Sequence, residues 1–205
     1  MSEWNDWFEP ATPSRQVALL RQMVGQRLTR LARFSLESPE ELMRPNPDLD
    51  DDAPLKPHEV FSLAAGPLLL RLDNGLEIGF GSSDHSEIIL DAKRLPDGRT
   101  SPHPYQEEGN FVLDAAEARF CRPEIRQMLG RPLRDVAVLK MDGAHFGKGR
   151  SFEVGLVIYV EQCPELILSA NLTKGLDDFA VTLREEILPE NRRYLTEERL
   201  APAGS

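Results

Sequence analysis

Long apolar runs are missing from this chain of 205 residues. A helix that spans a membrane needs about 18 or more consecutive apolar residues, so we expect no transmembrane helix. The first six residues are polar and acidic, unlike the basic and then apolar pattern of a secretory signal. With 40% hydrophobic and 28% charged residues, the composition is typical of a globular protein, and we expect it to be cytoplasmic.

Cysteine and basic residues are also scarce. The chain has only two cysteines, Cys121 and Cys163, which excludes a disulfide framework and a four-cysteine zinc site. Its 34 acidic residues outnumber its 24 basic residues and give a net charge of −10. Phosphate backbones repel an acidic chain, so we expect no nucleic-acid partner.

Motifs that would identify a reaction are missing as well. Gly143–Ser151 has neither the glycine spacing of a phosphate-binding loop nor a Ser or Thr after its lysine. Gly81–Ser86 holds Ser, Asp and His side by side, but it lacks the G-x-S-x-G elbow that presents a nucleophile. Cys121 lies beside Arg119 and Arg122, which would lower the pKa of its thiol, yet no histidine accompanies it. We therefore expect no catalysis, no cofactor and no bound metal.

An internal repeat is the clearest feature that the chain does have. Residues Arg21–Leu28 recur as Arg126–Leu133, 105 positions later, and the match continues without gaps. A second block, at a shorter offset, matches Gly66–Leu72 with Gly155–Val160. Two blocks in the same order indicate a duplication. The repeat divides the chain into a first unit, residues 1–112, and a second unit, residues 113–205.

The repeat changes the interpretation of the helices. Ser14–Leu36 alone resembles one long amphipathic helix, but Gly130 and Pro132 stop a helix at that point of the second copy. Each unit then reads as helix, strand, hairpin and strand. Asn74-Gly75 provides a tight turn for the first hairpin, and Glu161–Pro164 predicts a longer connection in the second. We expect an α+β fold of mainly antiparallel sheet, packed as one pseudo-symmetric domain.

The expected elements are short. Helices are predicted at Pro13–Val24 and Pro123–Leu129, each with proline near its first turn. Strands are predicted at Leu31–Leu36, Leu68–Leu72, Leu76–Phe80, Glu87–Leu90, Val136–Met141 and Phe179–Leu183, and at the two arms of the second hairpin. A charged C-terminal segment, Pro189–Leu200, is predicted to form a last helix on the surface.

The two units differ by an acidic insertion in the first. Between its first strand and its hairpin the first unit has 29 residues, whereas the second has 13, so 16 residues are extra. They lie in the proline-rich segment 37–60, which has eight acids, two bases and a net charge of −6. Segment 117–150 is basic instead, with eight bases and four acids. The charge is therefore distributed unevenly along the chain.

The acidic insertion has two interpretations. In the first interpretation it is an arm that binds a basic partner, because opposite charges speed association and disfavour wrong partners. Alternatively it is a solvated loop, since proline and clustered like charges disfavour packing. A calcium loop is not expected, because the EF-hand glycine and glutamate are missing. The candidate partner-binding residues are Glu40, Glu41, Asp48, Asp50, Asp51 and Asp52.

The second unit also carries a family resemblance. Met128–Leu133, Gly155–Ile158, Leu166–Leu172 and Asp177–Val181 resemble the β-rich cores of immunity proteins from bacterial polymorphic-toxin systems. The resemblance implies a protein that neutralises a co-encoded toxin by binding it directly. Many members are acidic where their toxins are basic nucleases, which agrees with the net charge here. The shared motifs are glycine and apolar spacings, so no binding residue is carried over from the family.

These observations favour a non-enzymatic protein that binds a basic partner, expected to be a toxin, and occludes its surface. Two alternatives remain open. A small enzyme would have its ligand site between the two units, where packed units commonly leave clefts. A structural module would form homo-oligomers through exposed strand edges, which invite pairing.

Overall fold

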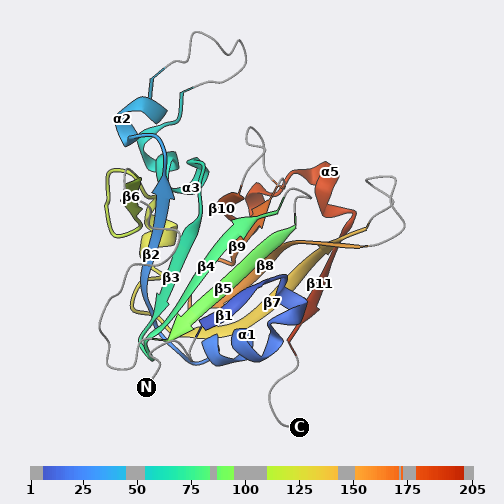
Figure 1. Ribbon diagram of the computed structural model, residues 1–205. Coiled ribbons are helices and arrows are strands. Elements are labelled where there is room, and N and C mark those ends of the chain that lie inside the picture. The colour runs from blue at the N-terminus through green and yellow to red at the C-terminus, as the bar shows by residue number, and fades with distance from the viewer. Residues whose placement is uncertain are drawn as a thin grey trace.

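The computed structural model describes residues 7–44, 54–83, 87–94, 110–142, 151–170, 172 and 179–200 (Figure 1). Two antiparallel sheets dominate it, which confirms the predicted α+β class. The first sheet has the strand order β1-β5-β4-β3-β2-β6 and the second has β10-β9-β8-β7-β11. The strands of the first sheet are β1 (Trp7–Ala11), β2 (Leu28–Ser35), β3 (Leu68–Leu72), β4 (Leu76–Ser82), β5 (Ile88–Arg94) and β6 (Phe111–Asp114). Those of the second are β7 (Leu133–Met141), β8 (Phe152–Val160), β9 (Leu166–Ala170), β10 (Phe179–Leu183) and β11 (Leu195–Arg199).

The helical elements are all short. They are η1 (Pro13–Arg15), α1 (Val17–Met23), α2 (Pro39–Leu42), η2 (Pro57–Glu59), α3 (Val60–Leu63), α4 (Pro123–Arg126), η4 (Arg184–Glu186) and α5 (Pro189–Arg192). Helix α1 ends at Met23, one residue before its predicted end, whereas α4 ends at Arg126, three residues before its predicted end, and residues 127–130 form a turn. Gly25 has a φ of 84° and Gly130 a φ of 80°. Such positive φ angles favour glycine. No helix in the described part of the chain is long and apolar enough to cross a membrane.

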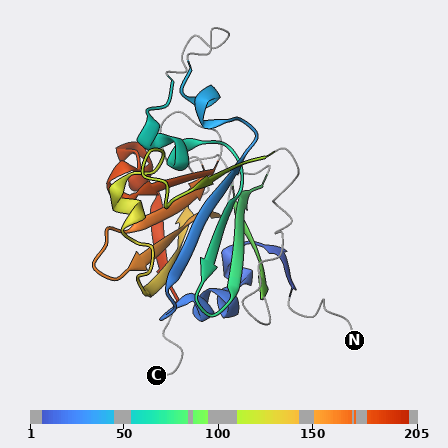
Figure 2. The ribbon, with the colours of Figure 1, turned by 90° about the vertical axis from the view of Figure 1, so that its left-hand side faces the viewer.

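The two sheets pack face to face around one apolar core, and Figure 2 shows them as separate layers. Leu31, Leu70 and Ile78 of the first sheet share this core with Ile158 and Leu166 of the second. Helix α1 adds Leu19, Leu20 and Met23 to the core. Burial of this apolar surface is the main force that holds the two units together.

A pseudo-two-fold relation connects the units, and their backbone hydrogen bonds show it. The Gly25 N–H donates to the Leu133 carbonyl at 2.7 Å, and the Gly130 N–H donates to the Leu28 carbonyl at 2.7 Å. Each residue of one bond lies 105 positions from its counterpart in the other. The repeat found in the sequence is therefore also a repeat in space.

The register of the strands defines the offset between the two hairpins more precisely than the sequence match does. Leu31 lies opposite Leu70 in the first sheet, as Val136 lies opposite Ile158 in the second. The hairpins are thus related by an offset of 88, and the sequence match of Gly66 with Gly155 was wrong by one residue. A slip of one residue turns every side chain to the opposite face of a strand. Sequence similarity alone missed it because both faces of β3 and β8 are largely apolar.

The second hairpin has the longer connection, as predicted, with five residues between β8 and β9 and three between β3 and β4. The two turns still share one hydrogen bond, because the Cys163 N–H donates to the Val160 carbonyl as the Gly75 N–H donates to the Leu72 carbonyl, both at 3.2 Å. Gln162 takes the positive φ, 56°, that the turn requires. The predicted C-terminal helix exists only as α5, and β11 follows it as an edge strand on β7. Strand β11 lies on β7 as β6 lies on β2, so each unit ends with an edge strand that was not predicted.

Candidate functional site

The acidic insertion begins and ends on a fixed stem, which we define as residues 36–44 and 54–66. A capping box starts α2: the Ser38 hydroxyl accepts from the Glu41 N–H, and the Glu41 carboxylate accepts from the Ser38 N–H at 2.8 Å. The Leu55 N–H donates to the Leu42 carbonyl at 3.1 Å and so brings the two ends together. Leu42 and Leu55 also pack against the core. The chain therefore leaves and re-enters the fold at one place.

The predicted binding residues divide between the stem and residues outside the description. Glu40 and Glu41 lie on α2 and are exposed, and the Glu40 carboxylate lies 3.6 Å from Arg119. Hydrogen bonds from the Ser38 side chain and backbone hold the pKa of Glu41 below its ordinary value. Asp48, Asp50, Asp51 and Asp52 lie outside the described residues.

A buried arginine holds the segment through which the chain returns from the insertion to the first sheet. Arg33 of β2 is 0% exposed, and its guanidinium donates to the carbonyls of Phe61 at 2.9 Å, Ala64 at 2.6 Å and Gly66 at 2.9 Å. It also donates to the carbonyl of Phe179, in the second unit, at 2.8 Å. A buried guanidinium is costly unless such bonds satisfy it. One side chain thus joins β2, the stem and the other unit.

Arg33 is specific to the first unit. The offset of 105 places Val138 at its position in the second unit, and both face a leucine across the sheet, Leu68 and Leu156. The second unit has no insertion to hold, and an apolar side chain fills the position. Arginine therefore replaces the apolar residue in the unit that carries the insertion.

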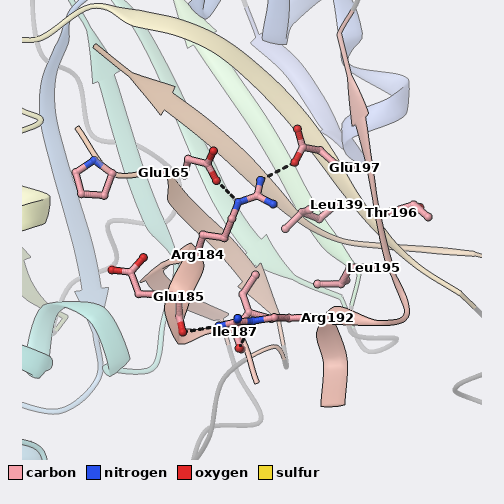
Figure 3. A pocket seen from close by; sticks show the side chains of 10 residues that line it. Leu139, Glu165, Arg184, Glu185, Ile187, Arg192, Leu195, Thr196 and Glu197 are labelled. Carbon is pink, nitrogen blue, oxygen red and sulfur yellow. Dashed lines mark hydrogen bonds and ion pairs between the residues drawn. The ribbon is translucent and has the colours of Figure 1, made fainter. Parts of the chain in front are cut away.

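A second candidate site is a pocket of about 510 Å³ on the outer face of the second sheet (Figure 3). Elements η4 and α5 form one wall, β11 forms another, and Leu139 of β7 lies between them. Its apolar lining belongs to a separate cluster in which Ile187 covers the outer side of the sheet. The residues that line it are Leu139, Pro164, Glu165, Arg184, Glu185, Ile187, Arg192, Leu195, Thr196 and Glu197.

The charges of this pocket are paired with one another. Arg184 lies between Glu165 and Glu197, with 2.5 Å from its Nη2 to the Glu197 carboxylate (Figure 3). Partial burial raises the pKa of Glu197, but hydrogen bonds from Tyr159 and Arg184 outweigh it and hold that pKa below its ordinary value. Partial burial and its bond to Glu197 raise the pKa of Tyr159 to about 12. Both shifts lead away from neutrality, unlike the tuning of a general acid or base.

The first sheet carries a related ion pair, in which the carboxylate occupies an equivalent position and the arginine does not. The offset of 88 relates Glu165 to Glu77, which accepts from the Arg71 Nε at 2.6 Å. The Glu77 side chain is 0% exposed. Because a carboxylate with a basic partner recurs in both units, we interpret it as a feature of the scaffold.

A polar hollow of about 430 Å³ lies where the two units meet. Thr12 and Arg15 of the first unit line it together with Lys140 and Glu153 of the second. The Glu153 carboxylate accepts from the Ser14 N–H at 2.8 Å, and a hydrogen bond to Glu198 raises the pKa of Lys140. The hollow is the place that the enzyme alternative requires, but these two charges already have partners within the protein.

The expectation for Cys121 was wrong. Cys121 is buried, and this burial raises the pKa of its thiol to about 12 despite Arg126 and Arg122. Within the described residues, no three His, Cys, Asp or Glu side chains gather as metal ligands do. Residues 143–150, which belong to the segment compared with a phosphate-binding loop, lie outside the description. Comparisons of the chain with models of protein families, with curated proteins and with solved structures found no match.

Proposed function

We propose that this protein is a non-enzymatic, cytoplasmic binding protein that neutralises a basic partner, a co-encoded bacterial toxin. The acidic insertion would cover the basic surface on which the partner's activity depends. The anchoring of the insertion is the observation that carries the proposal. A solvated loop needs no dedicated support, whereas this one has a capping box, a closed stem and a fully buried arginine.

The anchoring has a physical consequence for binding. Tethering both ends of a loop on a rigid stem lowers the conformational entropy that is lost when the loop meets a partner. The segment 37–60 carries −6 of the net charge of −10, so the stem also concentrates the field. A concentrated field speeds association with a basic protein and disfavours acidic ones.

The outer-face pocket supports binding rather than catalysis. Glu197 of the pocket and its hydrogen-bond partner Tyr159 have shifted pKa values and keep one charge state across neutral pH. A paired network of this kind orders a surface but does not exchange protons at pH 7. The proposal therefore assigns no reaction to the pocket.

Co-expression with the product of the neighbouring gene tests the proposal. We expect a complex that survives purification and a loss of the partner's toxicity. The variant that replaces Asp50, Asp51 and Asp52 with Asn should bind at least ten-fold more weakly at low salt. The deficit should close near 1 M salt, where the screening length is only about 3 Å.

A matched variant separates a local effect from a general charge effect. Glu124, Glu190 and Glu198 are exposed, and replacing all three with Gln removes the same charge outside the insertion. We expect this variant to bind as the wild type does. Equal losses in both variants would refute the role of the insertion, and the absence of any complex would refute the proposed function.

A further inference from the structure

Large apolar side chains are exposed at one end of the first sheet. Leu36 is 81% exposed, Phe111 is 43% exposed and Val112 is 41% exposed. Leu36 directly follows β2, and Phe111 pairs with Ser35 across the β2–β6 ladder, so the three are close together. Phe111 and Val112 are consecutive residues of β6, so their side chains point to opposite faces of the sheet. We therefore call Leu36 and Val112 the edge cluster. Contiguous exposed apolar side chains often mark interaction surfaces.

The backbone beneath the edge cluster also faces outward. The Phe34 N–H donates to the Pro67 carbonyl, on the β3 side of β2. Val112 is the cross-strand partner of Phe34, so alternation directs its N–H and C=O away from β2. Strand β6 is the last strand of its sheet within the described residues. An extended segment can therefore bond to this edge.

The equivalent edge of the second unit is protected. Glu197 lies opposite Leu139 as Val112 lies opposite Phe34, and Leu139 and Phe34 are 105 positions apart. Strand β11 continues with Glu198 and Arg199, both exposed. Charged side chains on an edge strand prevent unwanted pairing. The first unit lacks this protection at the same place in the fold.

The charge beside the edge cluster indicates what binds there. Leu36 is followed by Glu37, and α2 presents Glu40 and Glu41, all exposed. A segment that places apolar side chains on the cluster would have its flanking side chains beside these carboxylates. A second copy of this chain fits poorly, because it brings its own acidic insertion and a net charge of −10.

We infer that the edge cluster and the acidic stem form one docking surface for an extended, basic segment of a partner protein. Apolar side chains of the segment pack on Leu36 and Val112, and its arginine or lysine side chains face Glu37 and α2. This inference rests on the proposed function, because it names the surface through which the basic partner is held. It adds apolar contacts and main-chain hydrogen bonds to the electrostatic attraction between the acidic insertion and the partner.

Two synthetic peptides test the inference on the full chain. One alternates arginine with valine over eight residues, and the other has serine in place of each valine, so the charge is the same. We expect the valine peptide to bind at least ten-fold more tightly by fluorescence anisotropy. It should also slow hydrogen exchange at the Val112 amide.

Matched variants locate the effect. The double variant Leu36→Ser, Val112→Thr should lose the preference for the valine peptide, with binding to both peptides close to that of the serine peptide. Val24 is 39% exposed at the end of α1, so Val24→Thr is a control of equal chemistry and should bind as the wild type does. Thermal melting verifies that each variant is folded.

The outcomes separate this inference from the proposed function. If both peptides bind equally and with strong salt dependence, the edge cluster is not a docking surface, although the acidic insertion keeps its role. If neither peptide binds, the inference is overturned, and only co-expression decides the proposed function. If light scattering shows a wild-type dimer that the double variant abolishes, the surface belongs to a second copy of the chain.

Discussion

The two units share a scaffold of five strands, to which the first unit adds β1 beside β5, and three further differences lie around β2. The reciprocal bonds of Gly25 and Gly130 show how closely the scaffolds correspond. Around β2 the differences are the insertion, Arg33 in place of Val138, and Val112 in place of Glu197. All three lie at or beside β2 of the first unit. A duplicated fold can keep its packing in both copies while one copy takes on a new surface, and these differences indicate which copy did so.

The largest expected effect on stability comes from Arg33→Val, which gives the first unit the apolar residue type that the second unit has at this position. Arg33→Val leaves the carbonyls of Phe61, Ala64 and Gly66 without their donor in a buried place. Each buried acceptor that loses its donor costs about 1–3 kcal/mol, so the loss of the whole network should cost at least about 3 kcal/mol. We expect urea unfolding to show a loss of that size. The control Val138→Ala should lose about 1–3 kcal/mol, and equal stability of Arg33→Val and wild type would contradict the anchoring role.

Gly66 should show the next largest effect. It lies where the insertion rejoins the sheet, with φ of 117°, and an added Cβ would lie 2.0 Å from the Phe34 carbonyl oxygen. Gly66→Ala therefore combines backbone strain with a steric clash and should cost about 2–4 kcal/mol in urea unfolding. Gly25 has positive φ but open space around it, so Gly25→Ala should cost only about 1 kcal/mol. Similar losses at both glycines would mean that the close approach at Gly66 is unimportant.

The contrast at Arg33 shows what the sequence could predict. The turn signals at Gly130 and Pro132 correctly excluded one long helix, although α4 ends three residues before its predicted end, and the apolar runs placed most strands. These features are local, so local patterns were sufficient. The offset of 105 already pairs Arg33 with Val138, and an arginine at an apolar position of a repeat was a signal for a buried, bonded side chain that the sequence analysis missed.

The edge strands and the pocket were harder to predict for physical reasons. Strand β6 has four residues, and β11 is mostly charged, so neither has the alternation typical of a strand. Their pairing with β2 and β7 depends on contacts between segments that are distant in sequence. The pocket likewise joins β7 to η4, α5 and β11, which only the fold brings together. Recognition of the full repeat would have helped, because an edge strand beside β2 in the first unit predicts an edge strand beside β7 in the second.

A smaller effect on stability, which depends on pH, is expected at Glu197 on the edge strand β11 of the second unit. Glu197 has a pKa below its ordinary value of 4.5, so its contribution to stability is complete above pH 4.5 and is lost as the pH falls through the lowered pKa. We expect Glu197→Gln to cost about 1 kcal/mol at pH 7, since the network is partly exposed, and almost nothing at low pH. Urea unfolding at several pH values measures this. The exposed Glu190→Gln should cost less at pH 7, and a constant deficit for Glu197→Gln at all pH values would contradict the assignment.

The smallest expected effect concerns Tyr159, whose counterpart in the first unit at the offset of 88 is Arg71. The Tyr159 hydroxyl donates to Glu197, and its pKa of about 12 lies above the ordinary value of 10.0. Its contribution is therefore complete below pH 10.0 and is lost as the pH rises toward 12. Tyr159→Phe should cost about 0.5 kcal/mol at pH 7. An ultraviolet absorbance titration of the variant should lack one phenol that ionises near pH 12, whereas loss of a phenol near pH 10.0 would show that Tyr159 is not held by Glu197.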